Sequence, residues 1–252
     1  MIDQMTLAYI NLYGVLGALE ELTALDPVAQ QMLRGKKPIR LGILVKGGPS
    51  ATLAFEQQRC TFIEGVERCD IKLAFGTPEK FNGMIAGTVT PIPRKGYTHL
   101  FFLTKTFAKL TDRLGAFLRA TPEQLDDPAF LRISTTMLLG VIGQAVAQVG
   151  NHDEVGRFSA SNLVDGAVQL SIQDGPGVAV RVKDHVLTCE KARIDDPRAV
   201  MEFHDYRLAH DLFDGRVNAM ACIGQQLIAM RGMISMIDNI NRMLDRVSIY
   251  LQ

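Results

Sequence analysis

The feature that most constrains this chain is an internal repeat that spans its whole length. Short patterns recur in order at a nearly constant separation: Gly14-Val15-Leu16-Gly17 as Gly140-Val141-Ile142-Gly143, Asp26 as Asp153, Gly48-Pro49 as Gly175-Pro176, Phe75 as Phe203, and Gly87 as Gly215. The separation grows only from 126 to 128 residues, which fits two one-residue insertions in surface connections. The repeat predicts two domains, residues 1–126 and 127–252, packed about an internal pseudo-twofold axis.

The composition allows two cores and excludes some partners. Of the 252 residues 47% are hydrophobic, and Lys plus Arg balance Asp plus Glu at 27 each, so we expect no nucleic-acid partner. No uninterrupted run of 18 apolar residues occurs. The stretch Met1–Leu22 carries Asp3, Glu20 and Glu21 and no basic residue, so it reads as an amphipathic helix and not a signal peptide. Membrane contact is expected to be transient at most.

The cysteines indicate a reducing compartment. Cys60, Cys69, Cys189 and Cys222 show no Cys-x-x-Cys spacing and do not correspond across the repeat. Reduced, buried thiols in a cytoplasmic protein are therefore expected, with no metal site and no cofactor.

Hydrophobic alternation and turn residues predict five strands in each copy. In the first copy they are Ile39–Val45, Ala51–Phe55, Cys60–Glu64, Asp70–Phe75 and Tyr97–Leu103. In the second they are Ala167–Ile172, Val178–Val182, Val186–Glu190, Ala199–Phe203 and Gln226–Met230. The fold class is α+β: two similar repeats, each a roughly five-stranded, mostly antiparallel sheet covered on one face by helices.

Helical periodicity and capping residues place the helices around these strands. The expected helices are Met5–Leu22, Pro27 to Gly35, Pro78–Ala86, Phe130–Val149, Tyr206–Asp214 and a long closing helix in each copy. The second closing helix carries an apolar stripe at i, i+3, i+4 spacing, which Met236 and Met243 widen.

In the second copy, these patterns resemble the sterol carrier protein family, the type-two lipid-transfer domain. The resemblance lies in Gln169-Leu170-Ser171-Ile172, Asp195-Asp196-Pro197 with Val200-Met201-Glu202-Phe203, Asp211 to Ala219, and Leu227 to Gly232 with the closing helix. It covers about Asp165 to Leu251. The first copy is identified mainly through the second, and it has Leu103-Thr104 where the second has Arg231-Gly232.

The resemblance implies an apolar tunnel between sheet and helices, which takes a fatty acid, a fatty acyl group, a sterol-like molecule or another lipid without covalent chemistry. The candidate ligand-binding residues in the second copy are Phe203, Leu212, Phe213, Met220, Ile223, Met230, Met233, Met236, Ile237 and Ile240. Arg231 is added as a guanidinium that could hold an anionic head group at the tunnel mouth. Taken singly, each apolar residue is better explained as part of a solid core, and only the set as a whole favours a cavity.

Two other classes of function stay open on the sequence. In the first, the cavities are closed and the pseudo-dimer is a structural or regulatory platform that binds a protein partner of unknown identity. In the second, His204 or His210 serves a hydrolase or transferase. Their spacing of six suits neither a shared metal nor a base with its orienting group, and helix capping or solvated ion pairs are the expected roles of this region. No nucleophile motif occurs, so we predict no catalytic residues and no enzyme activity.

Overall fold

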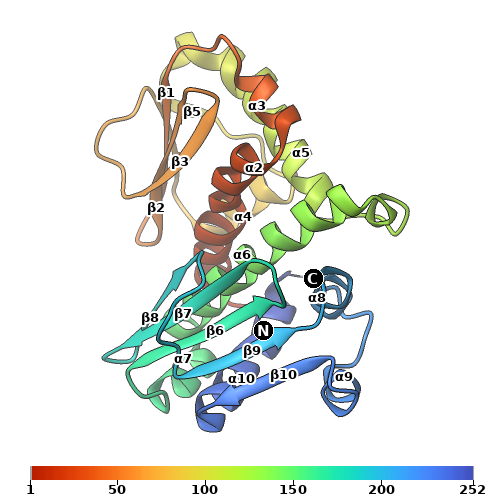
Figure 1. The fold of residues 1–252 in the computed structure, drawn as a ribbon. Coiled ribbons are helices and arrows are strands. Elements are labelled where there is room, and N and C mark those ends of the chain that lie inside the picture. Colours follow the sequence, from red (N-terminus) through yellow and green to blue (C-terminus); the bar gives the residue numbers. More distant parts are fainter. Residues whose placement is uncertain (1, 252) are drawn as a thin grey trace. The chain divides into compact units, whose positions relative to one another are not determined.

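A computed structural model describes residues 2–251, with the side chain of Met220 left aside. The chain divides into two compact units, residues 1–119 and 120–252. Residues 120–126 group with the second unit because the short 3-10 turn η5 (Gln124–Asp126) leads into the long helix α6 (Pro128–His152) and packs against it. The fold is α+β, with one mixed five-stranded sheet in each unit (Figure 1).

The sheet of the first unit has the strand order β3-β2-β1-β4-β5. Its strands are β1 (Ile39–Val45), β2 (Ser50–Glu56), β3 (Arg59–Glu64), β4 (Ile71–Phe75) and β5 (Pro93–Lys95). The first four match the expected strands closely. Strands β1 and β4 run parallel, and the other three neighbouring pairs are antiparallel.

The first unit begins with a nearly continuous helical run. It consists of α1 (Gln4–Tyr9), the π-helical turn η1 (Ile10–Val15), the 3-10 turn η2 (Leu16–Ala18) and α2 (Leu19–Leu25). Helix α2 packs on β3, where the hydroxyl of Thr23 accepts a hydrogen bond from the backbone N–H of Cys60 at 2.8 Å. The remaining helices are α3 (Pro27–Leu33), α4 (Pro78–Ile85) and α5 (Ala108–Leu118).

The prediction of a strand at Tyr97–Leu103 is wrong. These residues form the 3-10 turn η3 (Tyr97–His99) and the beginning of the π-helical segment η4 (Phe102–Phe107), and the fifth strand is the short edge strand β5. Gly96, with φ of +90°, turns the chain out of the sheet after β5. Phe102, from the expected strand, and Phe107, from the expected closing helix, both pack edge-on against Phe55.

The second unit has the strand order β10-β9-β6-β7-β8. Its strands are β6 (Gly166–Ile172), β7 (Gly177–Lys183), β8 (Val186–Glu190), β9 (Ala199–Phe203) and β10 (Ile228–Gly232). Strands β6 and β9 run parallel and the other neighbours are antiparallel, so this sheet is mixed as well. The loop between β8 and β9 is fixed by Gln169, whose amide oxygen accepts from the N–H of Ile194 at 2.9 Å.

Helices α6 and α10 (Ile234–Leu251) lie on one face of the second sheet (Figure 1). The shorter helices are α7 (Glu154–Ser161), α8 (Tyr206–Phe213) and α9 (Ala219–Gly224). Asp205 caps α8 through the N–H of Leu208, and Gly215, with φ of +70°, follows its end. Capping in this region is therefore confirmed.

Helix α6 runs three residues past its expected end at Val149, because Gly150 does not stop it. Gly150 is a packing residue instead. A Cβ atom there would lie 2.6 Å from Leu187 of β8 and 3.0 Å from the sulfur of Met243 on α10. Gly143, nearer the start of the helix, packs in the same manner against Cys189 and Val178. The two glycines let α6 approach β7, β8 and α10 closely.

By length and composition α6 passes as a membrane-spanning helix, and 61% of its most apolar 18-residue window is buried. It packs against α7, α8, α10 and strands β7 and β8 of its own unit. These contacts are those of a central core helix.

Candidate functional site

The predicted site falls on the end of the second sheet formed by β9 and β10. Met201 lies opposite Met230, and Phe203 lies opposite Ile228, so these four side chains share one face. Met201, Phe203 and Ile228 are buried and Met230 is half-buried. The face is the one that α10 covers. The structure therefore gives Phe203 and Met230 a common apolar surface toward the helices.

Helix α10 supplies the opposite wall. Met236, Ile237 and Ile240 from the predicted set are exposed by 2% or less, and Met243 one turn further on is fully buried. The helix is amphipathic, and Asp238, Arg242 and Asp245 stand on its exposed side. The predicted apolar stripe of the closing helix is thus in place.

Toward the N-terminal end of α10 the same apolar layer reaches the surface. Leu212, Phe213 and Ile223 on α8 and α9 are half-buried, and Met233 is 38% exposed. The ring of Phe213 stands edge-on to that of Phe203, with their centroids 5.3 Å apart. The side chain of Met220 lies outside the portion of the chain that the structure describes. The predicted residues therefore include both buried and solvent-accessible side chains.

Arg231 does not join the apolar residues. It follows Met230 on β10, so its side chain points to the opposite face of the sheet. There its guanidinium donates to Glu202 of β9 at 3.2 Å, with 65% of the side chain exposed. The structure thus separates Arg231 from the helix-covered face that carries Met230.

His210 is completely buried, whereas a solvated role was expected for it. Its Nε2 lies 3.2 Å from the hydroxyl oxygen of Ser134 on α6, and its Nδ1 lies 3.5 Å from a carboxylate oxygen of Asp214. Burial lowers the pKa of His210 below its ordinary value, and Asp214 opposes that shift. His210 is therefore neutral at pH 7.

Ser134, His210 and Asp214 have the residue types of a hydrolase triad, but the burial of Ser134 and His210 does not fit catalysis. Ser134 and His210 both have no exposed surface, so no substrate carbon can reach the hydroxyl. The contact holds α8 to α6. His204, by contrast, is exposed and lies just before the cap of α8. The sequence spacing could not show that one histidine faces α6 and the other faces solvent.

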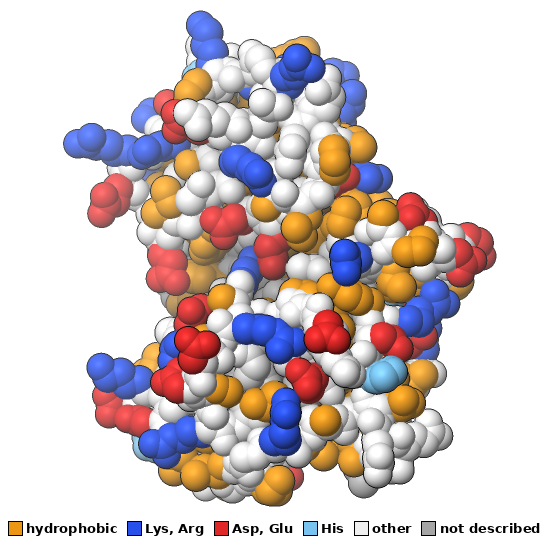
Figure 2. Space-filling model, in the orientation of Figure 1, with side chains coloured by type: hydrophobic (Ala, Val, Ile, Leu, Met, Phe, Trp, Pro, Cys, Tyr) orange, Lys and Arg blue, Asp and Glu red, His pale blue; other side chains and the backbone are white. Residues whose placement is uncertain are grey.

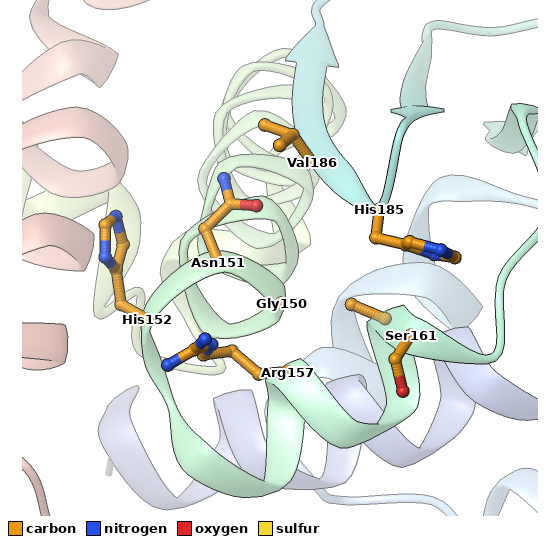
Figure 3. A pocket seen from close by; sticks show the side chains of 8 residues that line it. Gly150, Asn151, His152, Arg157, Ser161, His185 and Val186 are labelled. Atoms are coloured by element: carbon orange, nitrogen blue, oxygen red, sulfur yellow. The ribbon is translucent and has the colours of Figure 1, made fainter.

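A groove of about 460 Å³ lies elsewhere in the second unit (Figure 3). It is bordered by the end of α6, by α7 and by the turn between β7 and β8. Its lining residues are Gly150, Asn151, His152, Arg157, Ala160, Ser161, His185 and Val186. None of them belongs to the set predicted from the sequence. No motif marked them, because they come from three short segments that only the fold brings together.

The groove is polar at its rim. The side chain of Asn151 is fixed to the backbone of Leu187 on β8, donating to its carbonyl at 2.8 Å and accepting from its N–H at 2.9 Å. Figure 3 shows the side chains of Arg157, Ser161 and His185 around the opening. The hydroxyl of Ser161 is also engaged, because it donates to the carbonyl of Phe158 at 2.7 Å.

No cluster of three or more His, Cys, Asp or Glu side chains suited to a metal ion occurs among residues 2–251, Met220 aside. None of the four cysteines, all of which the structure describes, forms a disulfide, and Cys60 and Cys222 are buried.

Comparison with known proteins finds similar regions among solved structures. No protein-family model matches the chain, and no curated protein matches it. The chain is similar to sterol carrier protein 2. A crystal structure of that protein has 15% identity and a TM-score of 0.34, covering 44% of this chain and 92% of its own. The sterol carrier protein domain 2 of Helicoverpa armigera has 11% identity and a TM-score of 0.36, covering 44% and 88%.

An enzyme of known structure also has a region similar to this chain. The inverting sec-alkylsulfatase of a Pseudomonas species has 11% identity and a TM-score of 0.25, and the match covers 57% of this chain but only 28% of the sulfatase.

Proposed function

We propose that the second unit binds an apolar small molecule of the lipid class noncovalently, in a tunnel between the sheet and α8, α9 and α10. The observation that carries the proposal is the apolar layer that continues from fully buried Ile240 to exposed Met233. A hydrocarbon chain entering beside Met233 would meet apolar side chains along its whole path. The sequence resemblance of residues 165–251 to the lipid-transfer family supports the same assignment.

Methionine suits such a wall. Met201 and Met230 lie on β9 and β10, Met236 lies on α10, and Met233 is the residue between β10 and α10. Their side chains are unbranched and polarisable, so they can adjust to guests of different shape. We therefore propose a site of broad specificity for fatty acids, acyl groups or sterol-like molecules.

The energetics are sufficient. Burial of each methylene contributes about 0.8 kcal/mol, so a chain of about a dozen methylenes gains on the order of 10 kcal/mol. Lost translational and rotational freedom costs several kcal/mol. The expected dissociation constant is therefore about micromolar.

We further propose that the two units arose by tandem duplication. Both sheets place their first strand beside a parallel fourth strand, in the same relative order. In both units an aspartate that caps a short helix is held by an arginine of the closing helix, Asp26 by Arg113 and Asp153 by Arg246. The second unit is assigned the ligand because its fifth strand β10 has five residues, whereas the corresponding strand β5 of the first unit has only three.

The test is displacement of a fluorescent fatty acid from the delipidated protein. We expect saturable binding at micromolar concentration, weakened several-fold by Met233→Ser at the open end of the layer. Ile249→Ser is the matched control, because Ile249 is 40% exposed near the other end of α10. Absence of displaceable binding at tens of micromolar would refute the proposal, as would equal losses in the two variants.

A closed module that binds a protein partner is the alternative function. The complete burial of Ile240 and Met243 favours it, because tightly packed side chains leave no room for a guest. Native mass spectrometry of the protein as expressed separates the two. Copurified lipid supports a cytoplasmic carrier, whereas a ligand-free mass with a tightly bound protein supports the module.

A further inference from the structure

The first unit has an exposed apolar and basic segment that neither the fold nor the proposed ligand site uses. Ile92 is 77% exposed, Tyr97 63%, Leu100 42% and Phe101 67%. All four lie within ten residues, between the end of α4 and the π-helical segment η4. Such large side chains grouped on a surface mark an interaction site.

The segment is anchored to the core of the first unit by side chains on its inner side. Phe102 and Phe107 pack on Phe55, and the ammonium of Lys95 donates to the carbonyl of Cys69 at 2.6 Å. Tyr97, Leu100 and Phe101 follow the i, i+3, i+4 spacing of one helical face. The exposed apolar side chains are therefore presented by an anchored backbone, on the side away from the core.

Along the chain, the stretch that carries these side chains is basic. Residues 80–111 contain five Lys and Arg and no Asp or Glu. The ammonium of Lys36, from the loop after α3, lies 5.8 Å from the centre of the Phe101 ring. The whole first unit, residues 1–119, has 15 Lys and Arg against 10 Asp and Glu, a net charge of +5, whereas residues 120–252 have 12 against 17, a net charge of −5. On the face drawn in Figure 2, hydrophobic, basic and acidic side chains are interspersed.

We propose that residues 92–105 dock the protein on an anionic membrane surface. Tyr97, Leu100 and Phe101 would enter the interfacial region, while Arg94, Lys95 and Lys105 pair with acidic head groups. Aromatic side chains favour that depth, and basic residues beside them add electrostatic attraction. This inference is independent of whether the second unit holds a ligand.

The experiment is vesicle flotation of the full chain. We expect binding to phosphatidylcholine vesicles that contain about 30% phosphatidylglycerol, little binding to phosphatidylcholine alone, and release when the ionic strength rises from about 0.1 M to about 0.5 M. Arg94→Gln and Lys105→Gln should each weaken binding about fivefold. Neither side chain has a hydrogen-bonded partner in the described structure, so neither substitution should change the melting temperature.

The apolar contribution needs its own variant. Leu100→Ser combined with Phe101→Ser should lower vesicle binding about tenfold or more. Phe158→Ser is the matched control, since Phe158 is also 67% exposed but lies on α7 of the acidic unit. Equal binding to neutral and anionic vesicles, or equal losses in control and double variant, would overturn the proposal. So would a concentration-dependent dimer, seen by light scattering and lost in the double variant, because the segment would then bind a second copy.

Discussion

The guanidinium of Arg246 holds both carboxylate oxygens of Asp153, at 2.6 and 3.1 Å. The same carboxylate accepts from the hydroxyl of Tyr250 at 2.7 Å and caps α7 through the N–H of Gly156. One buried aspartate thereby ties the closing helix α10 to the joint between α6 and α7. Because its burial is nearly complete, its charge depends on these donors.

The first prediction concerns acid stability. Burial alone would raise the pKa of Asp153, but Arg246, Tyr250 and Gly156 outweigh it and lower the pKa to about 2. A carboxyl whose pKa is depressed in the folded state stabilises the protein above its unfolded pKa, and that contribution disappears as the pH falls. We expect a loss of about 2 kcal/mol between pH ~4 and pH ~2, measured by denaturant unfolding at several pH values.

Removing the arginine tests the same contact. Arg246→Gln should destabilise the fold by about 3 kcal/mol at pH 7 and shrink the acid-dependent loss, because the carboxylate stays buried with fewer donors. Arg242→Gln, one turn earlier, is the control. Its partner Asp238 and Arg242 itself are each 59% exposed, so the change should stay within about 0.5 kcal/mol. Similar losses in both variants would contradict the prediction.

The second prediction concerns two helical glycines with opposite surroundings. Gly143→Ala on α6 should destabilise by about 1–3 kcal/mol, because the new Cβ would lie 2.8 Å from both Cys189 and Val178. Gly115→Ala on α5 meets nothing within 4 Å and should stabilise by about 0.5–1 kcal/mol. Thermal unfolding of the two variants beside the parent chain gives the comparison, and a stabilising Gly143→Ala would show that α6 does not approach β7 so closely.

A third prediction follows from the buried histidine. Burial depresses the pKa of His210, so the unfolded chain takes up a proton at a higher pH than the folded chain does. Stability should therefore fall as the pH decreases through the ordinary histidine pKa of about 6.5. His210→Gln should flatten the dependence of the melting temperature on pH between about 7.5 and 5.5. Exposed His204, changed to Gln, should leave that slope as it is in the parent chain.

The fourth prediction separates the two faces of β10. Arg231→Ala should leave the affinity for a fluorescent fatty acid unchanged and alter the unfolding free energy by no more than about 0.5 kcal/mol. The reason is that Arg231 points away from Met230 and pairs with Glu202 near solvent. A marked loss of affinity would place the ligand head group on the outer face of the sheet.

Much of the fold was predictable because local signals agreed with the final packing. Asp26 before Pro27 and Thr77 before Pro78 marked helix starts that the structure confirms. Strand Ala199–Phe203 has the predicted bounds. These elements are specified by side chains within a few residues of each other, which a single sequence displays directly.

The predictions failed where residues far apart in the sequence determine the local structure. Gly150 resembles a helix stop, but its missing Cβ makes room for Leu187 and Met243, far along the chain. Tyr97–Leu103 has the residue types of a strand. The strand that pairs with β4 nevertheless lies earlier, at Pro93–Lys95, and Gly96 ends it.

The candidate site was likewise predictable only where its residues lie close together in the sequence. Helical spacing marked Met236, Ile237 and Ile240 as one stripe, and all three lie on the buried face of α10. Arg231 takes the opposite face because it follows Met230 within β10, whereas the expected strand ended at Met230 and left Arg231 outside it. The groove beside Asn151 had no local signal at all.

The side chain of Asn151 covers part of the outer edge of the second sheet. Strand β8 is the last in its sheet, and an outer strand with free backbone groups invites a neighbouring molecule to add a strand of its own. The Asn151 amide already occupies the outward N–H and carbonyl of Leu187, as a fragment of a further strand would. A strand added at this border could therefore hydrogen-bond to Leu187 only by displacing the Asn151 side chain.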